Sequence, residues 1–301
     1  MSREGSDAVD PATGVPAALL DFDRTLRTGG VTALELLGGY DAYTNQPGPV
    51  PAEVLRGVPV REVAGWRVTA DVYVPHGEPP HPTVLWLHGG AWVMGAPATH
   101  RRLAEDLCAL GLLTFVLDYR RAPKHRFPAG LDDARAALAW VADQAGGYGG
   151  DATRLFIGGD SAGGNLAAAV LATGVGPDVR GAILAYGIYD VHRALPALVD
   201  LVGGPDPDSQ LYLEPDDARA LVNDPRLHPD RYCAGFPRAL VLSGAEDPLH
   251  AESEALVSSL TAAEVPHTFV VADAPHGFLQ LPTHPGHAVG LRAIEQFVTA
   301  A

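Results

Sequence analysis

Residues 154–170 constrain the fold of this chain more than any other stretch. A short apolar run of strand type at 155–157 continues into the turn Gly159-Asp-Ser-Ala-Gly163, and an alanine-rich helical pattern follows at 165–172. Ser161 stands in the middle of this turn, where bulky neighbours would prevent closure and the serine itself sits in strained backbone. The pattern therefore predicts a strand, a tight turn and a helix in immediate succession.

The same alternation of strand and helix patterns continues along most of the chain. Two runs with period-two hydrophobicity, at 58–63 and 66–74, predict an antiparallel pair of strands. Further strands are expected at 83–87, 112–117, 155–157, 181–186, 239–242 and 268–272, with helices at 99–110, 128–144, 165–172, 252–263 and 289–298. Such alternation indicates a single α/β domain, with a mostly parallel central sheet and helices on both faces.

Two segments depart from this rhythm. Residues 1–50 are rich in proline, glycine and aspartate and contain one helical pattern at 31–37. Residues 190–236 separate two expected strands and hold Gly-Pro-Asp clusters between short helical pieces. Because the second segment also contains several leucines, we interpret it as a lid over the core rather than as a disordered loop.

The charge of the chain argues against several classes of function. Thirty-six acidic residues against 21 basic ones give a formal charge of −15, which argues against nucleic-acid binding and against adsorption to anionic membranes. No apolar stretch reaches the length of a membrane span, and the first residues show no secretory signal pattern. Two cysteines, Cys108 and Cys233, do not make a disulfide framework. We therefore expect a cytoplasmic protein without a membrane span.

Three residues in different parts of the chain have the types and order of a catalytic triad. A serine nucleophile needs a base to accept its proton and a carboxylate to orient that base. Asp247 and His276 follow Ser161 in chain order, each just past an expected strand. Taken singly, Asp247 would be read as a turn or helix-cap residue and His276 as a loop histidine, and Glu246 is a rival acid. Their joint occurrence predicts a Ser-Asp-His triad.

The segment His88-Gly-Gly-Ala91 follows the expected strand 83–87 and supplies a further part of such a site. Acyl transfer develops an oxyanion, and each preorganised backbone donor around it is worth about 3–4 kcal/mol in barrier. Small residues let the backbone approach the substrate closely. The pattern therefore predicts an oxyanion loop, opposite the helix start after Ser161.

Taken together, these motifs resemble the hormone-sensitive-lipase family of α/β-hydrolases. The loop at 88–91 is similar to its HGGG motif, and residues 159–164 are similar to its GDSAGG elbow. Residues 118–134 resemble the segment DYRLAPEHPFPAALDDA, and Asp247-Pro-Leu and His276-Gly-Phe resemble the acid and base motifs. The likeness extends over about 55–298, with 190–236 matching poorly.

The resemblance implies an α/β-hydrolase fold with a helical cap. The cap would come from about 1–50 and 190–236, and the catalytic core from about 55–189 and 237–301. It also implies a triad of Ser161, Asp247 and His276, with oxyanion-hole donors at Gly89, Gly90, Ala91 and Ala162. The expected activity is that of a serine carboxylesterase on short- to medium-chain acyl esters, without cofactor or metal. The resemblance also allows a homodimer.

Three departures from the family pattern bear on substrate preference. Ala91 replaces the third glycine of the loop, and its methyl group is expected to narrow the acyl pocket. Ala251 stands where a second acidic residue is usual, and Gly187 replaces a usual proline.

Other functions of the same site stay open from the sequence. They include a deacetylase, acyltransferase, cyclase or dehydratase that modifies a natural product, and a non-catalytic small-molecule receptor. His284 and His287 could suggest a metal site, but no carboxylate pattern accompanies them, and the Pro-Gly pair between them argues against helical spacing. We therefore expect them in a solvated loop.

Overall fold

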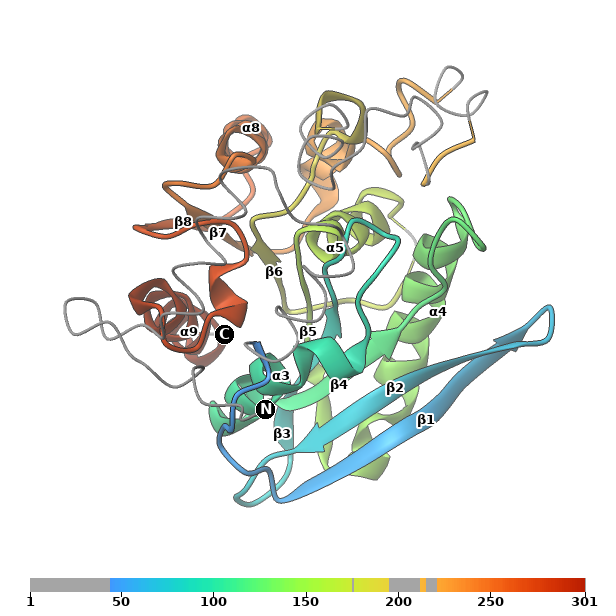
Figure 1. Ribbon diagram of the computed structural model, residues 1–301, viewed down its shortest axis with the longest axis vertical. Helices are drawn as coiled ribbons and strands as arrows, with labels where there is room; N and C mark the ends of the chain where they lie inside the picture. The colour runs from blue at the N-terminus through green and yellow to red at the C-terminus, as the bar shows by residue number, and fades with distance from the viewer. Residues whose placement is uncertain (1–43, 175, 195–211, 215–220, 301) are drawn as a thin grey trace, which may run out of the picture.

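The computed structural model describes residues 44–174, 176–194, 212–214 and 221–300. Within them, one eight-stranded sheet forms the centre of the molecule (Figure 1), with strands in the order β1-β2-β4-β3-β5-β6-β7-β8. The strands are β1 (Glu53–Val63), β2 (Trp66–Val74), β3 (His81–Leu87), β4 (Leu113–Asp118), β5 (Gly150–Asp160), β6 (Gly181–Ala185), β7 (Ala239–Gly244) and β8 (His267–Ala272). The α-helices are α3 (Arg101–Ala109), α4 (Ala129–Gln144), α5 (Ala162–Ala172), α8 (His250–Ala262) and α9 (Pro285–Thr299).

The sheet is mostly parallel, as the sequence predicts. β1 pairs with β2 and β2 with β4 in antiparallel fashion, and every other neighbouring pair is parallel. Ala64 and Gly65 join β1 to β2, and both have positive φ, which suits a two-residue hairpin turn. Because parallel strands run the same way, the loops that follow β3, β5, β7 and β8 emerge at one edge of the sheet.

Helices cover both faces of the sheet (Figure 1). Successive strand residues point to opposite faces, so Leu85 and Trp86 of β3 belong to different core clusters. Leu85 packs in the cluster that contains α4, α5 and α8, and Trp86 packs in the cluster that contains α3 and α9. This burial on both faces explains why the parallel strands read as continuous apolar runs rather than as alternating ones.

The helix starts differ from the sequence expectation by one to four residues, and two of them change how individual residues are interpreted. α4 begins at Ala129, so Pro128 precedes the helix instead of opening it. α9 begins at Pro285 rather than near residue 289, and the solvated loop expected around His284 and His287 is wrong. The His284 ring accepts a hydrogen bond from the Gly286 nitrogen at 3.0 Å and caps the helix. His287 is buried, and its Nδ1 contacts the Leu279 carbonyl at 2.7 Å.

Most of the expected cap lies outside the described residues, including all of 1–43 and most of 195–220. The division into cap and core therefore stays a prediction. The two ends of the 190–236 insertion are described, and the Val191 nitrogen donates to the Leu227 carbonyl at 3.0 Å. The insertion thus leaves and rejoins the core at one place.

The two cysteines are separate, buried thiols. Cys108 is in α3, and Cys233 is in the 3-10 segment η4 (Pro229–Gly235). Neither forms a disulfide bond, as their number in the sequence suggested. In the described part of the chain, no helix combines the length and the apolar character needed to cross a membrane.

Candidate active site

Ser161 stands at the sharp turn between β5 and α5. Its backbone has φ 53° and ψ −118°, an unfavourable conformation for a residue with a side chain. A Cβ on Gly163 would lie 1.9 Å from the Leu87 carbonyl oxygen, and one on Gly159 would lie 2.4 Å from the Gly163 carbonyl oxygen. Only glycine at these two positions lets the turn press against β3, and the turn holds Ser161 beside the end of that strand.

His276 connects Ser161 with Asp247. The His276 Nε2 atom lies 3.0 Å from Ser161 Oγ, and its Nδ1 atom lies 2.8 Å from Asp247 Oδ2. The other carboxylate oxygen of Asp247 accepts a hydrogen bond from the Leu249 nitrogen at 2.7 Å, which fixes the carboxylate in the loop after β7. The structure therefore brings together the three residues that sequence order singled out. Glu246, the rival acid, is exposed.

The environment of His276 favours its protonated form. Burial lowers the pKa of His276, but the charge of Asp247 and its hydrogen bond raise it by more, so the net pKa lies above the ordinary histidine value. The edge of the Tyr186 ring packs against the imidazole, with ring centroids 5.1 Å apart. An imidazole oriented in this way can take a proton from Ser161 and hold it as an imidazolium beside a carboxylate.

The loop after β3, which contains the motif at 88–91, is closed into a tight turn by its own backbone hydrogen bonds. Gly90 has φ +121°, and a Cβ there would lie 2.3 Å from the Met94 carbonyl oxygen. The Gly90 carbonyl accepts hydrogen bonds from the nitrogens of Val93 and Met94 at 3.0 and 2.9 Å, which closes a tight turn. Ala91 also has positive φ, at 50°. These constraints hold the loop backbone in one conformation.

Three backbone N–H groups near this turn have no acceptor in the part of the chain that the structure describes. Among residues 44–174, 176–194, 212–214 and 221–300, none accepts a hydrogen bond from the nitrogens of Gly90, Ala91 or Ala162. Gly89 differs, because its nitrogen lies 3.2 Å from Asp160 Oδ2 and 3.3 Å from His100 Nε2. The expectation that Gly89 donates to an oxyanion therefore does not fit this structure.

Asp160 is a buried anion that sequence reasoning missed. Its side chain accepts hydrogen bonds from Trp86 Nε1 at 2.9 Å and from Gln280 Nε2 at 2.6 Å, and it lies 3.1 Å from His100 Nε2. Burial raises the pKa of Asp160, but the ion pair with His100 and the hydrogen bonds from His100 and Trp86 lower it by more. The available sequence signal was its place as the acidic residue of the GDSAGG-like elbow at the end of an apolar strand.

His88 supports the loop after β3 by packing against Tyr119 and does not take part in proton transfer. It is fully buried and stacks on the Tyr119 ring, with centroids 4.2 Å apart. The Tyr119 hydroxyl donates to the His88 carbonyl at 2.8 Å. Burial, together with the charge of His100, lowers the pKa of His88 to about 3, so its imidazole is neutral at physiological pH.

Comparison with known proteins shows the family of this chain. A family model described as the alpha/beta hydrolase fold matches residues 84–280, well over half of the chain. The chain belongs to the α/β-hydrolase fold family. Its relatives bear out the resemblance to the carboxylesterases of the hormone-sensitive-lipase family that the motifs at 88–91 and 159–164 indicated.

Two curated relatives and one solved structure are similar to this α/β-hydrolase. Carboxylesterase NlhH of Mycobacterium tuberculosis is 34% identical over 61% of this chain, and the aligned part spans 62% of the length of NlhH. An acetyl-hydrolase of Streptomyces hygroscopicus is 32% identical over 71% of this chain and 73% of its own length. The structure of LAE6, an alpha/beta hydrolase enzyme from the metagenome of Lake Arreo, matches with a TM-score of 0.80 and 26% identity, over 97% of this chain and 99% of LAE6.

A buried ion pair in this α/β-hydrolase holds the connection between β4 and α4. Arg120 contacts the Asp133 carboxylate through Nε at 2.8 Å and Nη2 at 3.0 Å, and its backbone nitrogen donates to the same carboxylate at 3.0 Å. Asp133 lies near the start of α4. The bidentate contact shows that it also fixes the loop in front of that helix.

Proposed function

We propose that this protein is a serine carboxylesterase that hydrolyses short- to medium-chain acyl esters through an acyl-enzyme intermediate. The observation that carries the proposal is the hydrogen-bonded chain from Asp247 through His276 to Ser161. Beside it lie the backbone N–H groups of Gly90, Ala91 and Ala162, which no described residue accepts from. The names of the relatives, a carboxylesterase and an acetyl-hydrolase, support the same activity.

In the acylation step, Ser161 Oγ attacks the carbonyl carbon of the ester. The Oγ proton passes to His276 Nε2, which lies 3.0 Å away, and Asp247 keeps the Nδ1 proton in place and stabilises the imidazolium. Negative charge then develops on the former carbonyl oxygen. We assign its stabilisation to the N–H groups of Gly90, Ala91 and Ala162. When the intermediate collapses, the bond to the alcohol breaks and His276 returns the proton to the leaving oxygen.

Deacylation repeats these steps with water as the nucleophile. His276 takes a proton from water, the hydroxide attacks the acyl carbon, and the same donors hold the oxyanion. Collapse of this second intermediate breaks the bond to Ser161 Oγ, and His276 returns the proton to that oxygen. The products are one carboxylic acid and one alcohol, and the free serine is regenerated.

The acyl side of the substrate is proposed to be short. Ala91 places a methyl group where the family pattern has glycine, beside a backbone nitrogen that faces the reacting carbonyl. A side chain at that point leaves less room for the acyl chain. The acetyl-hydrolase relative, whose name specifies a two-carbon acyl group, supports this preference.

Turnover of p-nitrophenyl esters tests the proposed activity. The wild type is expected to hydrolyse the acetate and butyrate faster than the dodecanoate, and Ser161→Ala is expected to lose about 10⁶-fold in kcat, because the nucleophile itself is removed. Far-UV circular dichroism and Tm serve as the folding control. Equal rates for wild type and Ser161→Ala would exclude Ser161 as the nucleophile.

A second candidate is removal of an acetyl group from a larger natural product, and the acetyl-hydrolase relative favours it. It uses the same residues and differs only in the alcohol part of the substrate. A comparison of kcat/KM for p-nitrophenyl acetate and for acetylated secondary metabolites distinguishes the two. The homodimer and the cytoplasmic location stay predictions.

A further inference from the structure

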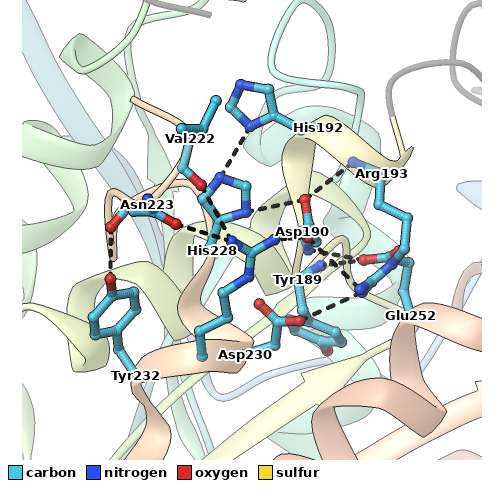
Figure 2. A network of polar contacts seen from close by, with 11 residues as sticks. Tyr189, Asp190, His192, Arg193, Val222, Asn223, His228, Asp230, Tyr232 and Glu252 are labelled. Atoms are coloured by element: carbon cyan, nitrogen blue, oxygen red, sulfur yellow. Dashed lines mark hydrogen bonds and ion pairs between the residues drawn. The ribbon is translucent and has the colours of Figure 1, made fainter. Parts of the chain in front are cut away.

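The two ends of the 190–236 insertion meet in a polar network outside the candidate active site (Figure 2). One end, which we call the first stem, comprises residues 189–193 after β6, and the other, the return stem, comprises residues 222–232. Backbone hydrogen bonds join the stems, including one from the Asp230 nitrogen to the Tyr189 carbonyl at 3.4 Å. None of the side chains in this network has a role in the ester hydrolysis proposed above.

Two histidines and one aspartate form the centre of the network, and we call them the stem cluster (Figure 2). His192 Nδ1 lies 3.0 Å from His228 Nε2, and His228 Nδ1 lies 3.0 Å from Asp190 Oδ1. One ligand atom from each of the three residues lies within 4.8 Å of the other two. His228 and Asp190 are buried, with 1% and 3% exposure, and His192 is half-buried. The cluster therefore presents imidazole nitrogens that converge at a partly desolvated place.

The contact between His228 and Asp190 is close but poorly aligned. His228 Nδ1 lies within ion-pair distance of the carboxylate, yet the geometry does not meet the angular requirement of a hydrogen bond. In the buried His228 ring, Nε2 therefore faces His192, and Nδ1 faces Asp190 without forming a well-aligned hydrogen bond.

The charges around the stem cluster suit a cation. Arg231 Nη2 contacts Asp190 Oδ2 at 2.7 Å, and Arg193 contacts both Glu252 and Asp230. Three carboxylates therefore surround two guanidinium groups, which leaves one formal negative charge in excess. The backbone nitrogens of Tyr189 and Asp190 donate to Glu252 Oε2 at 3.0 and 2.8 Å and fix the first stem to α8. A divalent ion at the two histidines would meet a site that is already held in place and slightly anionic.

We propose that His192 and His228 bind a divalent transition-metal ion of the zinc class, and that Asp190 orients His228 from its other ring nitrogen. Zinc–imidazole bonds of about 2.0–2.1 Å at tetrahedral angles separate two ligand nitrogens by about 3.4 Å, close to the 3.0 Å observed between His192 Nδ1 and His228 Nε2. The ion replaces the proton that these nitrogens share, and that proton moves to Nε2 of His192. A carboxylate behind a ligating histidine is the usual second partner of such a site. Water completes the coordination.

This ion would join the two stems, because His192 belongs to the first and His228 to the return stem. It would close the base of the insertion without contacting the reacting atoms. We therefore expect the ion to raise the stability of the folded chain and to leave the chemical step of ester hydrolysis unchanged. Zinc binding and ester hydrolysis are measured separately, so the failure of one does not decide the other.

Metal titration of the whole chain tests the proposal. After treatment with EDTA and dialysis, isothermal titration with ZnCl₂ is expected to show one ion bound per chain, and Tm is expected to rise by several degrees. MgCl₂ is expected to have no effect, because imidazole ligands do not suit Mg²⁺. His192→Ala and His192→Gln are expected to weaken zinc binding by at least about tenfold. His76→Ala, which removes an exposed histidine elsewhere, serves as the matched control and is expected to bind zinc like the wild type.

Two outcomes would overturn the proposal. One is the absence of stoichiometric zinc binding to the wild type. The other is zinc binding by both His192 variants with the affinity of the wild type, which would place the ion at other histidines. Because His192 is half-buried, the Tm of each metal-free variant is first compared with that of the wild type. The glutamine variant keeps most of the side-chain volume that alanine removes, so it separates the loss of the ligand from a loss of packing.

Discussion

Asp160 Oδ2 lies 3.2 Å from the backbone nitrogen of Gly89. Asp160 immediately precedes Ser161, and Gly89 immediately precedes Gly90, so one buried carboxylate joins the proposed nucleophile to the proposed oxyanion loop. The same oxygen accepts a hydrogen bond from Gln280, four residues after His276. Three loops that the sequence separates widely are thus tied to one anion, and the site is organised before any substrate binds.

The Asp160→Asn variant is predicted to lose both stability and activity. An amide of the same size keeps one oxygen and puts an NH₂ group in place of the other. Either Trp86, which donates to Oδ1, or Gly89 and Gln280, which donate to Oδ2, then lose their acceptor. Breaking such a buried charged pair costs about 3–5 kcal/mol. Urea unfolding measures the stability, and kcat for p-nitrophenyl acetate is predicted to fall as well. Asp143→Asn, at an exposed position of α4, is the control and should stay within about 0.5 kcal/mol of the wild type.

Substitutions at two neighbouring positions of the oxyanion loop are predicted to differ in their effect on activity. Gly90→Ala forces a Cβ to within 2.3 Å of the Met94 carbonyl oxygen at a φ of +121°, so the loop must move, and kcat is predicted to fall by about 100-fold or more. Ala91→Gly accepts the existing φ of 50° and keeps its N–H, so it should retain activity and hydrolyse longer acyl chains faster. Retained activity in Gly90→Ala would contradict the proposed donor arrangement.

The two neighbouring acids after β7 are predicted to differ sharply. Asp247→Asn removes the carboxylate that lies 2.8 Å from His276 Nδ1, and a loss of about 10⁴-fold in kcat is expected because the imidazole then takes the wrong tautomer. Glu246→Gln changes an exposed side chain beside it and should leave kcat near the wild-type value. A large loss with Glu246→Gln and none with Asp247→Asn would reverse the assignment.

The pH dependence of kcat/KM is predicted to follow His276. Its pKa is raised, because Asp247 outweighs the effect of burial, and only the neutral imidazole can accept the proton of Ser161. Activity is therefore lost as pH falls through this raised pKa, and the acid limb should lie above about 6.5, the ordinary histidine value. In Asp247→Asn the limb should move to lower pH. An acid limb of the wild type well below 6.5 would disagree with the structure.

Much of the architecture was predictable because it rests on local patterns. Buried parallel strands appear as short apolar runs, so β3 and β7 were located to within two residues, whereas only the last part of β5 was recognised. Ser161 and His276 were recognisable because their chemistry requires a fixed order along the chain and positions just past strands.

The features that were missed depend on partners far away in the sequence. Asp160 was recognised only as part of the turn around Ser161, since Trp86 and Gln280 give it a role of its own only through the fold. His284 and His287 read as a loop because Pro-Gly discourages a helix, whereas the structure uses that proline as the first helical residue and the His284 ring as its cap. Likewise, nothing in the sequence pairs His192 with His228, which only the meeting of the two stems brings together.

Covalent labelling with an alkyl fluorophosphonate, followed by intact-mass and peptide analysis, tests most directly whether Ser161 is an activated nucleophile. We expect one phosphonyl group per chain on the wild type, carried by Ser161, and none on Ser161→Ala under the same conditions. An unlabelled wild type, or an adduct that persists in Ser161→Ala, would contradict the assignment of Ser161 as the activated nucleophile.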